Sequence, residues 1–565
     1  MHLIRRGLIR QSVVEHPSAI VGILLLWFSC VVILHISGPA AAAAGCVEAK
    51  RPNFLVILAD DLGFSDLGCY GSEISTPNLD HLASNGLRFT QFYNTARCWP
   101  SRAALMTGHY AQAVRRDAVP GVPSGTRGTR PGWAKLIPEF LRLEGYRSYH
   151  SGKWHIDGKP LDNGFDRSLE VRWGENNYFK PLNTTEDGAA VVPGTNYYST
   201  THFADYATRC LDEHARTFPD RPFFLYLAFT APHFPLQAPE SDIAKYRNQY
   251  TNGWDIVSGE RRRRIAKLGI ATNTLPEMER EIGPPYDFPK AIERLGSGET
   301  NRPVPWTELT QEQRHFQVAK MAVHAAMVDR MDREIGRVLD QLKAIGAFEN
   351  TVILFASDNG ASAEIMVRGD GHDPEALPGS AATFLCLGPG WSSAANTPLR
   401  RHKTWVHEGG ISTPLIVHWP AGLKAKGELR HAPAHFIDIL PTILELAGAS
   451  RITPADAPRF PGRSLVPCFW EDIPGIHDDL WWQHENNCAI RQGDWKLVKD
   501  AKSSWALYNI AVDRGETRDL SSEHPDKAKA LASLWDRHSE EYRKLANKDL
   551  PDPPRASKRK NKAQP

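Results

Sequence analysis

The fold is decided by one short stretch, Phe54-Leu55-Val56-Ile57-Leu58-Ala59, which runs directly into Asp60-Asp61. An unbroken apolar run of this kind suits a strand that is buried on both faces, as in a parallel sheet. Comparable runs recur at Phe223 to Phe229, Val352 to Ala356 and Leu415 to Trp419. Between the runs, apolar residues at helical spacing occur at Pro77 to Asn85, Ala103 to Met106, Ala134 to Leu143 and Ala319 to Ile345. This alternation predicts an α/β fold, with a doubly wound, mixed but mostly parallel sheet flanked by helices.

The last part of the chain, after the helix-like segment Ile437 to Ala447, has a different pattern. Short strand-like runs lie at Leu480 to His484, Ala489 to Arg491, Trp495 to Lys499 and Ala506 to Tyr508, followed by a charged amphipathic segment at His524 to Leu545. We therefore expect a smaller C-terminal subdomain made of an antiparallel sheet and a helix. The polar, proline-bearing stretch Ala238 to Gln313 is expected to leave the core and shape an entrance.

Composition narrows the class of partner. The chain has 565 residues and a formal net charge of +2, and no basic stripe interleaved with aromatic residues, so nucleic acid is not expected as a partner. Eight cysteines are too few for a disulfide-built scaffold at this length. A pairing of Cys468 with Cys488 is conceivable and stays undecided.

The N-terminus has the order of a secretory signal peptide. Arg5, Arg6 and Arg10 precede an apolar run from Ala19 to Ile36, and small residues follow at Ala40 to Ala44. We expect an exported protein, in a periplasmic, secreted or other extracytoplasmic compartment. The alternative is a retained membrane anchor, because the run is long enough to come close to spanning a bilayer.

Polar side chains follow the predicted buried strands at the point where each strand ends. They are Asp60, Asp61, Lys153, His155, His233, Asp358 and Asn359. In an open α/β sheet the carboxyl ends of the strands share one edge, and ligands bind in the crevice outside it. Asp60, Asp61, Asp358 and the Asn359 carbonyl would supply the oxygen ligands that Ca²⁺ or Mg²⁺ prefers. Taken singly, each of these motifs is more often a helix cap or a turn.

Cys98-Trp99-Pro100-Ser101-Arg102 is the segment that points to chemistry. A lone cysteine is usually a small buried hydrophobe. Cys98, however, lies just before Pro100 and a helix-like segment, near a helix N-terminus where backbone N–H groups favour anions. Arg102 adds a fork-shaped donor suited to a tetrahedral oxyanion.

These segments together resemble the sulfatase family of the alkaline-phosphatase-like superfamily. The matching motifs, in order, are Asp60-Asp61-Leu62-Gly63, Thr76-Pro77-Asn78-Leu79-Asp80, the Cys-x-Pro-Ser-Arg core at Cys98, Gly152-Lys153-Trp154-His155, Pro232-His233, Asp358-Asn359-Gly360, Lys403 with Glu408-Gly409-Gly410, and Asp438 to Thr442. The resemblance covers roughly Arg51 to Leu520. It departs from the family pattern at Phe64-Ser65 and in the Met366 to Pro389 stretch, so the contacts there that select a substrate stay unknown.

The resemblance implies an arylsulfatase-type sulfuric ester hydrolase that converts a sulfate ester to an alcohol and inorganic sulfate. A separate formylglycine-generating enzyme would oxidise Cys98 to 3-oxoalanine (formylglycine), and the hydrate of that aldehyde would be the nucleophile. The cation, Ca²⁺ or alternatively Mg²⁺, would be held by Asp60, Asp61, Asp358, Asn359 and the modified Cys98.

The resemblance also implies roles for the remaining groups. Arg102 and Lys153 would orient the hydrate and neutralise developing charge. His233, assisted by Lys403, would protonate or polarise the leaving oxygen, and His155 would take the second proton of the hydrate. From the residues alone, a histidine is more often structural, and a lysine beside Arg400, Arg401 and His402 more often belongs to a solvated face.

Two other functions stay open. A phosphate or phosphonate monoester hydrolase of the same superfamily would use a similar metal and cationic pocket, and a non-catalytic glycan-binding relative would keep the fold without turnover. The natural substrate is not named by any residue, although a sulfated polysaccharide is the expectation for an exported enzyme. The expected parts of the chain are a signal peptide at 1–45, a catalytic α/β domain at 46–465, a C-terminal α+β subdomain at 466–550 and a disordered basic tail at 551–565.

Overall fold

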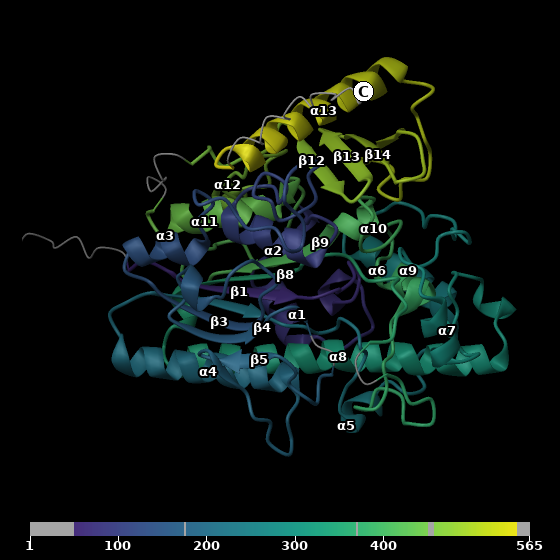
Figure 1. The fold of residues 1–565 in the computed structure, drawn as a ribbon, viewed down its shortest axis with the longest axis horizontal. Coiled ribbons are helices and arrows are strands. Elements are labelled where there is room, and N and C mark those ends of the chain that lie inside the picture. The colour runs from purple at the N-terminus through teal and green to yellow at the C-terminus, as the bar shows by residue number, and fades with distance from the viewer. Residues whose placement is uncertain (1–49, 175–176, 369–370, 450–456, 551–565) are drawn as a thin grey trace, which may run out of the picture. The chain divides into compact units, whose positions relative to one another are not determined.

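The computed structural model describes residues 50–174, 177–368, 371–449 and 457–550 (Figure 1). The predicted leader at 1–45 and the predicted basic tail at 551–565 lie outside the described residues. All elements below lie C-terminal to Lys50, in the unit that begins at Arg51. The domain boundaries given above stay a prediction.

A large mixed sheet forms the centre of the fold. Its strands run in the order β10-β2-β9-β8-β1-β7-β3-β4-β5-β6, with β11 paired to β2. Pairing is parallel between β8, β1, β7, β3 and β4, whereas β9 is antiparallel to both β8 and β2. The bounds are β1 Asn53–Ala59, β2 Leu87–Tyr93, β3 Arg147–Lys153, β4 Arg167–Val171, β5 Thr184–Glu186, β6 Ala189–Ala190, β7 Phe223–Ala228, β8 Thr351–Ser357, β9 Ser412–His418, β10 Glu428–Arg430 and β11 Ala434–His435. The predicted doubly wound α/β fold is therefore confirmed.

Helices cover both faces of this sheet (Figure 1). Leu55 and Ile57 of β1 pack in the core on the side of α1, α4 and α8, whereas Phe54 and Val56 pack in the core on the side of α2, α3 and α11. The strand is thus buried on both faces, which explains its unbroken apolar sequence. The helices are α1 Pro77–Ser84, α2 Cys98–Thr107, α3 Ile137–Leu143, α4 Ser199–Thr217, α5 Glu240–Ile243, α6 Gly253–Lys267, α7 Pro289–Leu295, α8 Gln311–Ala344, α9 Gly388–Ala395, α10 Glu408–Ile411, α11 Ile439–Leu446 and α12 Val466–Trp470.

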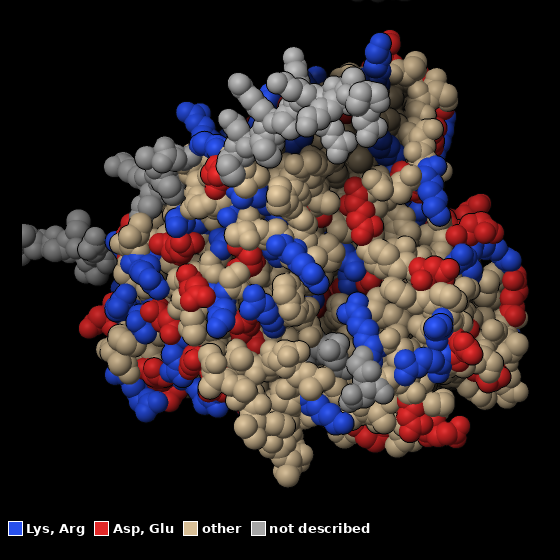
Figure 2. All heavy atoms as spheres, in the orientation of Figure 1, with Lys and Arg blue, Asp and Glu red and all other residues tan. Residues whose placement is uncertain are grey.

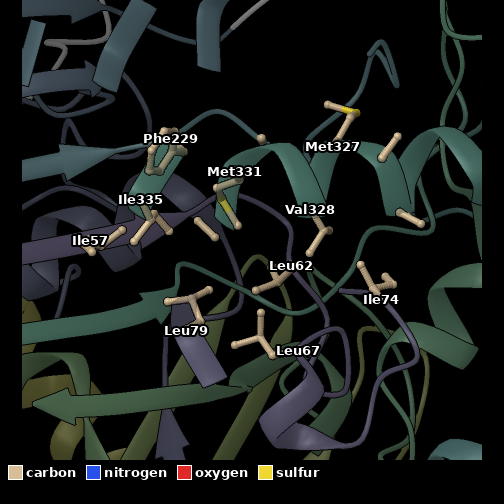
Figure 3. Packing of buried hydrophobic residues seen from close by; sticks show 14 of the residues in the cluster. Ile57, Leu62, Leu67, Ile74, Leu79, Phe229, Met327, Val328, Met331 and Ile335 are labelled. Atoms are coloured by element: carbon tan, nitrogen blue, oxygen red, sulfur yellow. The ribbon is translucent and has the colours of Figure 1, made fainter. Parts of the chain in front are cut away.

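The long helix α8 anchors the segment that follows β1. Figure 3 shows Val328 and Met331 of α8 facing Leu62, which comes directly after Asp60 and Asp61, and Leu79 of α1. All these side chains are fully buried. Burial of this apolar contact holds the turn after β1 in place, and with it the two carboxylates.

A second, antiparallel sheet follows in the order β12-β13-β14-β15. Its strands are β12 Leu480–His484, β13 Asn487–Gln492, β14 Trp495–Lys499 and β15 Ala506–Asn509, and α13 Pro525–Asn547 packs on β13 and β14. A buried ion-pair cluster joins this sheet to α10. Lys496 Nζ lies 2.9 Å from Glu408 Oε1 and 2.8 Å from Glu516 Oε1, and Arg514 lies 3.2 Å from Glu408 Oε2.

Several elements differ from the sequence-based expectation. Strand β2, helix α4 and helix α6 were not predicted, and Lys153 is the last residue of strand β3 rather than a residue that follows a strand. Helix α8 begins at Gln311 rather than Ala319, because the Thr310 hydroxyl accepts a hydrogen bond from the Gln313 N–H at 3.2 Å and caps a polar first turn. Cys468 and Cys488, the conceivable pair, are both free thiols.

The surface mixes both signs of charge. Figure 2 shows Lys and Arg interspersed with Asp and Glu over the face in view. Among the described residues, no helix is both long enough and apolar enough to cross a membrane.

We expect the ion-pair cluster around Lys496 to be essential for stability. Lys496→Met leaves the Glu408 and Glu516 carboxylates buried without their shared cation, so the free energy of unfolding should fall by about 3–5 kcal/mol. The urea concentration at the midpoint of unfolding measures this. Lys529→Met, on the exposed side of α13, is the matched control and should change the free energy by less than about 0.5 kcal/mol. Equal midpoints for the two variants would contradict the assignment.

Candidate active site

The site lies at the carboxyl ends of β1, β3, β7 and β8. Asp60 and Asp61 follow β1, and Asp358 and Asn359 follow β8, which is hydrogen-bonded to β1. The Asp358 N–H donates to the Ala59 carbonyl at 3.1 Å, so the ladder continues into the site. Asp61 has a φ of 66°, a left-handed conformation that Asp tolerates better than most residues. The chain turns there, and the two neighbouring carboxylates need not point to opposite faces.

Each carboxylate of the site touches a buried cation. Lys153 Nζ is 2.5 Å from Asp60 Oδ2, and Lys403 Nζ is 2.8 Å from Asp61 Oδ1. The Arg102 guanidinium donates to Asp358 Oδ2 at 2.8 Å and to the Lys153 carbonyl at 2.8 Å. All six side chains are almost fully buried. These contacts are charge-assisted hydrogen bonds in a low-dielectric environment, where they are strong.

Two buried oxygens among the four proposed metal-ligand side chains at the strand ends have no hydrogen-bond partner among the described residues. They are Asp60 Oδ1 and Asn359 Oδ1. The Asn359 amide nitrogen donates to Asp61 Oδ1 at 2.7 Å and to the Gly360 carbonyl, which leaves the Asn359 carbonyl oxygen as the unsatisfied atom. Unpaired oxygens on fully buried side chains are costly unless another group binds them. Because both are hard oxygen donors beside further carboxylates, the residues fit a Ca²⁺ or Mg²⁺ ion.

The electrostatics of the carboxylates also favour a cation. Burial opposes ionisation of Asp60, but the buried Lys153 and Arg102 cations hold its pKa below the ordinary value. Burial and the neighbouring Asp60 raise the pKa of Asp358 to about 7. Burial and mutual repulsion thus oppose the charged form of both carboxylates, and a bound divalent cation would favour it.

Cys98 is the first residue of α2, and its side chain is 3% exposed. Burial raises the pKa of the Cys98 thiol, and Lys153 and Lys403 oppose that shift. The thiol thus lies where a helix N-terminus and two ammonium groups would stabilise an anion. It is not poised to act as a thiolate, because the net shift of its pKa is upward.

His155 and His233 lie in the same cavity as Cys98, Lys153 and Lys403. Burial lowers the pKa of both imidazoles well below the usual range, and the charge of one lysine, Lys153 for His155 and Lys403 for His233, adds to the effect. His155 Nδ1 has no partner among the described residues. His233 Nε2 lies 3.6 Å from Asp61 Oδ2, and its Nδ1 is 2.5 Å from the Phe234 carbonyl oxygen.

All the site residues predicted from the sequence therefore lie together. The cavity itself, about 240 Å³ in volume, is lined by five of them, and Arg102 lies behind it against Asp358. One addition is that His233 joins Asp60 and Asp61 in a group whose ligand atoms lie within 4.8 Å of one another. The sequence suggested His233 only for proton transfer.

Sequence reasoning missed two residues of the site, Arg97 and Glu364. Glu364 Oε1 is 2.9 Å from Arg97, and Glu364 Oε2 is 3.0 Å from Lys403 Nζ. Arg97 also donates to the Thr404 hydroxyl and stacks on the Trp99 ring at 5.2 Å. Charges of opposite sign thus alternate along a row from the start of α2 to the site carboxylates, in the order Arg97, Glu364, Lys403 and Asp61. Arg97 directly precedes Cys98, but nothing near Glu364 in the sequence marks it.

Close backbone approach explains the glycines of two motifs. The Gly360 N–H donates to the Gly410 carbonyl at 3.0 Å, and a Cβ on Gly360 would lie 1.8 Å from the Gly409 carbonyl oxygen. Only glycine fits at this position. The turn after β8 therefore packs directly against the segment that carries Lys403. This contact fixes the position of Asn359 relative to Lys403.

A family model described as Sulfatase matches residues 52–449. The chain belongs to the sulfatase family. It is 34% identical over 543 residues to an uncharacterized sulfatase of Schizosaccharomyces pombe, and this match covers 86% of this chain and 93% of that protein. It is 31% identical over 448 residues to an arylsulfatase of Klebsiella aerogenes, with 72% and 89% covered. Sulfatases act on sulfate esters, and the family uses a metal ion and formylglycine.

Solved structures share the fold. Ps i-CgsB, crystallised in complex with k-i-k-neocarrahexaose, superposes with a TM-score of 0.61 at 26% identity, covering 87% of this chain and 93% of that one. The fold of this sulfatase therefore extends over nearly all the described residues.

We expect Glu364 to be a positioning residue for Lys403. Glu364→Gln keeps the shape but removes the charge that holds Lys403 and Arg97, so kcat for 4-nitrophenyl sulfate should fall roughly 10- to 100-fold, with a smaller change in KM. Glu299→Gln is the matched control. Glu299 is buried and lies 2.7 Å from the buried Lys320, outside the cavity.

The two variants should lose similar thermal stability, but only Glu364→Gln should lose activity. If kcat falls equally in both, the role of Glu364 is structural and the positioning role is wrong.

Proposed function

We propose that this sulfatase is an arylsulfatase-type enzyme whose nucleophile is made from Cys98 by a separate formylglycine-generating enzyme. One observation carries the proposal. Cys98 begins α2 inside a cavity walled by Lys153, Lys403, His155 and His233, beside two unpartnered oxygens on Asp60 and Asn359. Because burial raises the pKa of the Cys98 thiol, an unmodified cysteine would be a poor nucleophile at this position. The formylglycine that the family uses does not depend on a thiolate.

The cation, Ca²⁺ or Mg²⁺, would be held by Asp60, Asp61, Asp358, Asn359 and the modified Cys98. When bound, it would supply Lewis-acid polarisation of the sulfate oxygens and would lower the pKa of the nucleophilic hydroxyl. Arg102 fixes Asp358 by a two-nitrogen contact, with its NH2 at 2.7 Å and its Nε at 2.8 Å from Asp358 Oδ2. Its part is therefore to hold a ligand as well as to add positive charge behind the nucleophile.

The remaining cations and the histidines would handle charge and protons. Lys153 and Lys403 stand next to the nucleophile position and would neutralise charge that develops on the sulfate oxygens. His155 is neutral because of burial and Lys153, and its unpartnered Nδ1 would accept the second proton of the hydrate.

His233 needs a proton before it can serve as an acid. Its Nδ1 faces the Phe234 carbonyl, so Nε2 is the nitrogen left for the substrate side. Burial and the neighbouring Lys403 hold the pKa of this ring well below its usual range, but an entering sulfate ester would bring negative charge next to it and raise its pKa. His233, with Lys403 nearby, would then protonate the leaving oxygen.

The natural substrate we propose is a sulfated glycan. The support is that Ps i-CgsB, which has a similar fold and is 26% identical, was solved in complex with k-i-k-neocarrahexaose. We further propose that the protein is exported, on the order of charges and apolar residues in its first 45 residues.

The matured protein should hydrolyse 4-nitrophenyl sulfate, with release of inorganic sulfate. The tryptic peptide that contains Cys98 should have the mass of the aldehyde, and Cys98→Ala should abolish turnover. Removal of divalent cations with EDTA should reduce the rate at least about 100-fold, and added Ca²⁺ or Mg²⁺ should restore it.

Three results would each contradict part of the proposal. Turnover that survives EDTA would show that the reaction does not need the cation. An unmodified thiol with bound glycan and no turnover favours a binding protein. A faster reaction with 4-nitrophenyl phosphate than with the sulfate favours the phosphate ester hydrolase.

A further inference from the structure

The cavity that contains Cys98 has two walls, and each wall is made of the same three kinds of side chain. On one wall, the Trp173 ring meets the His155 ring edge-on at 5.6 Å, and the Arg172 guanidinium lies 5.4 Å over the Trp173 ring. Arg172 and Trp173 come directly after β4. Trp173 is 48% exposed, which is unusual for so large an apolar side chain.

On the other wall, the Phe234 ring lies 4.0 Å from the His233 ring, and the Arg368 guanidinium lies 5.5 Å over the Phe234 ring. Each wall therefore consists of a histidine of the site, an aromatic ring against it, and an arginine stacked on that ring. All six residues line the same cavity as Cys98.

Arg172 and Arg368 differ from the other cations of the site in their ion pairing. Arg97, Arg102, Lys153 and Lys403 each form an ion pair with a carboxylate. Among residues 50–174, 177–368, 371–449 and 457–550, no carboxylate forms an ion pair with Arg172 or Arg368. Stacking holds each guanidinium plane and leaves its N–H edges free to donate to a planar or tetrahedral anion.

We propose that these two walls of the cavity select sulfate esters of ring compounds that carry a second anionic group. The proposal rests on the proposed function and deepens it by naming the substrate class. The sulfate to be cleaved lies over Cys98, the ring packs on Trp173, and the second anion, a carboxylate or another sulfate, binds Arg172 or Arg368. A monosulfated neutral ring makes only the first two of these contacts.

Binding to the Cys98→Ala protein tests the proposal without turnover. The probes for calorimetric titration are 3-carboxyphenyl sulfate, its neutral methyl ester, and 1,3-phenylene disulfate. The dianions should bind at least roughly 10-fold tighter than the ester, and the better of the two shows whether carboxylate or sulfate is preferred. Arg172→Ala and Arg368→Ala should each reduce this ratio by about fivefold, and the double variant should abolish it.

Arg127→Ala is the matched control, since Arg127 is exposed and lies outside the cavity; it should leave the ratio unchanged. Equal affinity for the ester and the dianions, or equal loss for all three probes in the arginine variants, would overturn the proposal. Hydrolysis of 4-nitrophenyl sulfate by the matured enzyme is measured in parallel. If the matured enzyme hydrolyses 4-nitrophenyl sulfate but the protein binds the ester and the dianions equally, only this subsite is wrong. If there is no hydrolysis but the dianions bind more tightly than the ester, only the proposed function is wrong.

Discussion

Carboxylates that are buried side by side repel one another, and the site is organised around that repulsion. Asp60, Asp61 and Asp358 gather at the ends of adjacent strands, where water cannot screen them. Lys153 contacts Asp60, Lys403 contacts Asp61, and Arg102 contacts Asp358 closely and Asp60 at 3.9 Å. These protein cations do not fully compensate the buried negative charge, because burial and Asp60 still raise the pKa of Asp358 to about 7. In addition, Asp60 Oδ1 and Asn359 Oδ1 have no hydrogen-bond partner among the described residues. The remaining negative potential is what a divalent ion would use.

The rest of the fold keeps these charges in place. Cores on both faces of the sheet fix β1 and β8, and α8 packs on the turn that carries the first two carboxylates. The second sheet supports the segment around Cys98 from another direction. The Trp482 indole N–H donates at 2.8 Å to the carbonyl of Asn94, four residues before Cys98, and the Asn487 amide donates at 3.2 Å to the carbonyl of Thr404, next to Lys403. A subdomain distant in sequence thus stabilises both sides of the cavity.

Much of this arrangement follows from the sequence, for physical reasons. A strand buried on both faces has an unbroken apolar sequence, so β1, β7 and β8 were predictable, and so was the edge where their polar successors meet. Helix α6 was not, because its run of four arginines suggests a solvated segment, yet Arg261 is fully buried between Asp66 and Glu73. Strand β2 carries Arg88 and Gln91 among its apolar residues and lacks such a run. Glu364 acts through contacts with Arg97 and Lys403, which are far from it in sequence.

The most direct test of the central claim is a calorimetric titration of Ca²⁺ into chelator-stripped protein. The account predicts one ion bound per chain, with affinity at least roughly 10-fold weaker in Asp358→Asn and unchanged in Asp340→Asn, where the carboxylate is exposed on α8. No binding to the unaltered protein, or binding that is equally tight in Asp358→Asn, would show that the carboxylates at the strand ends do not form a cation site.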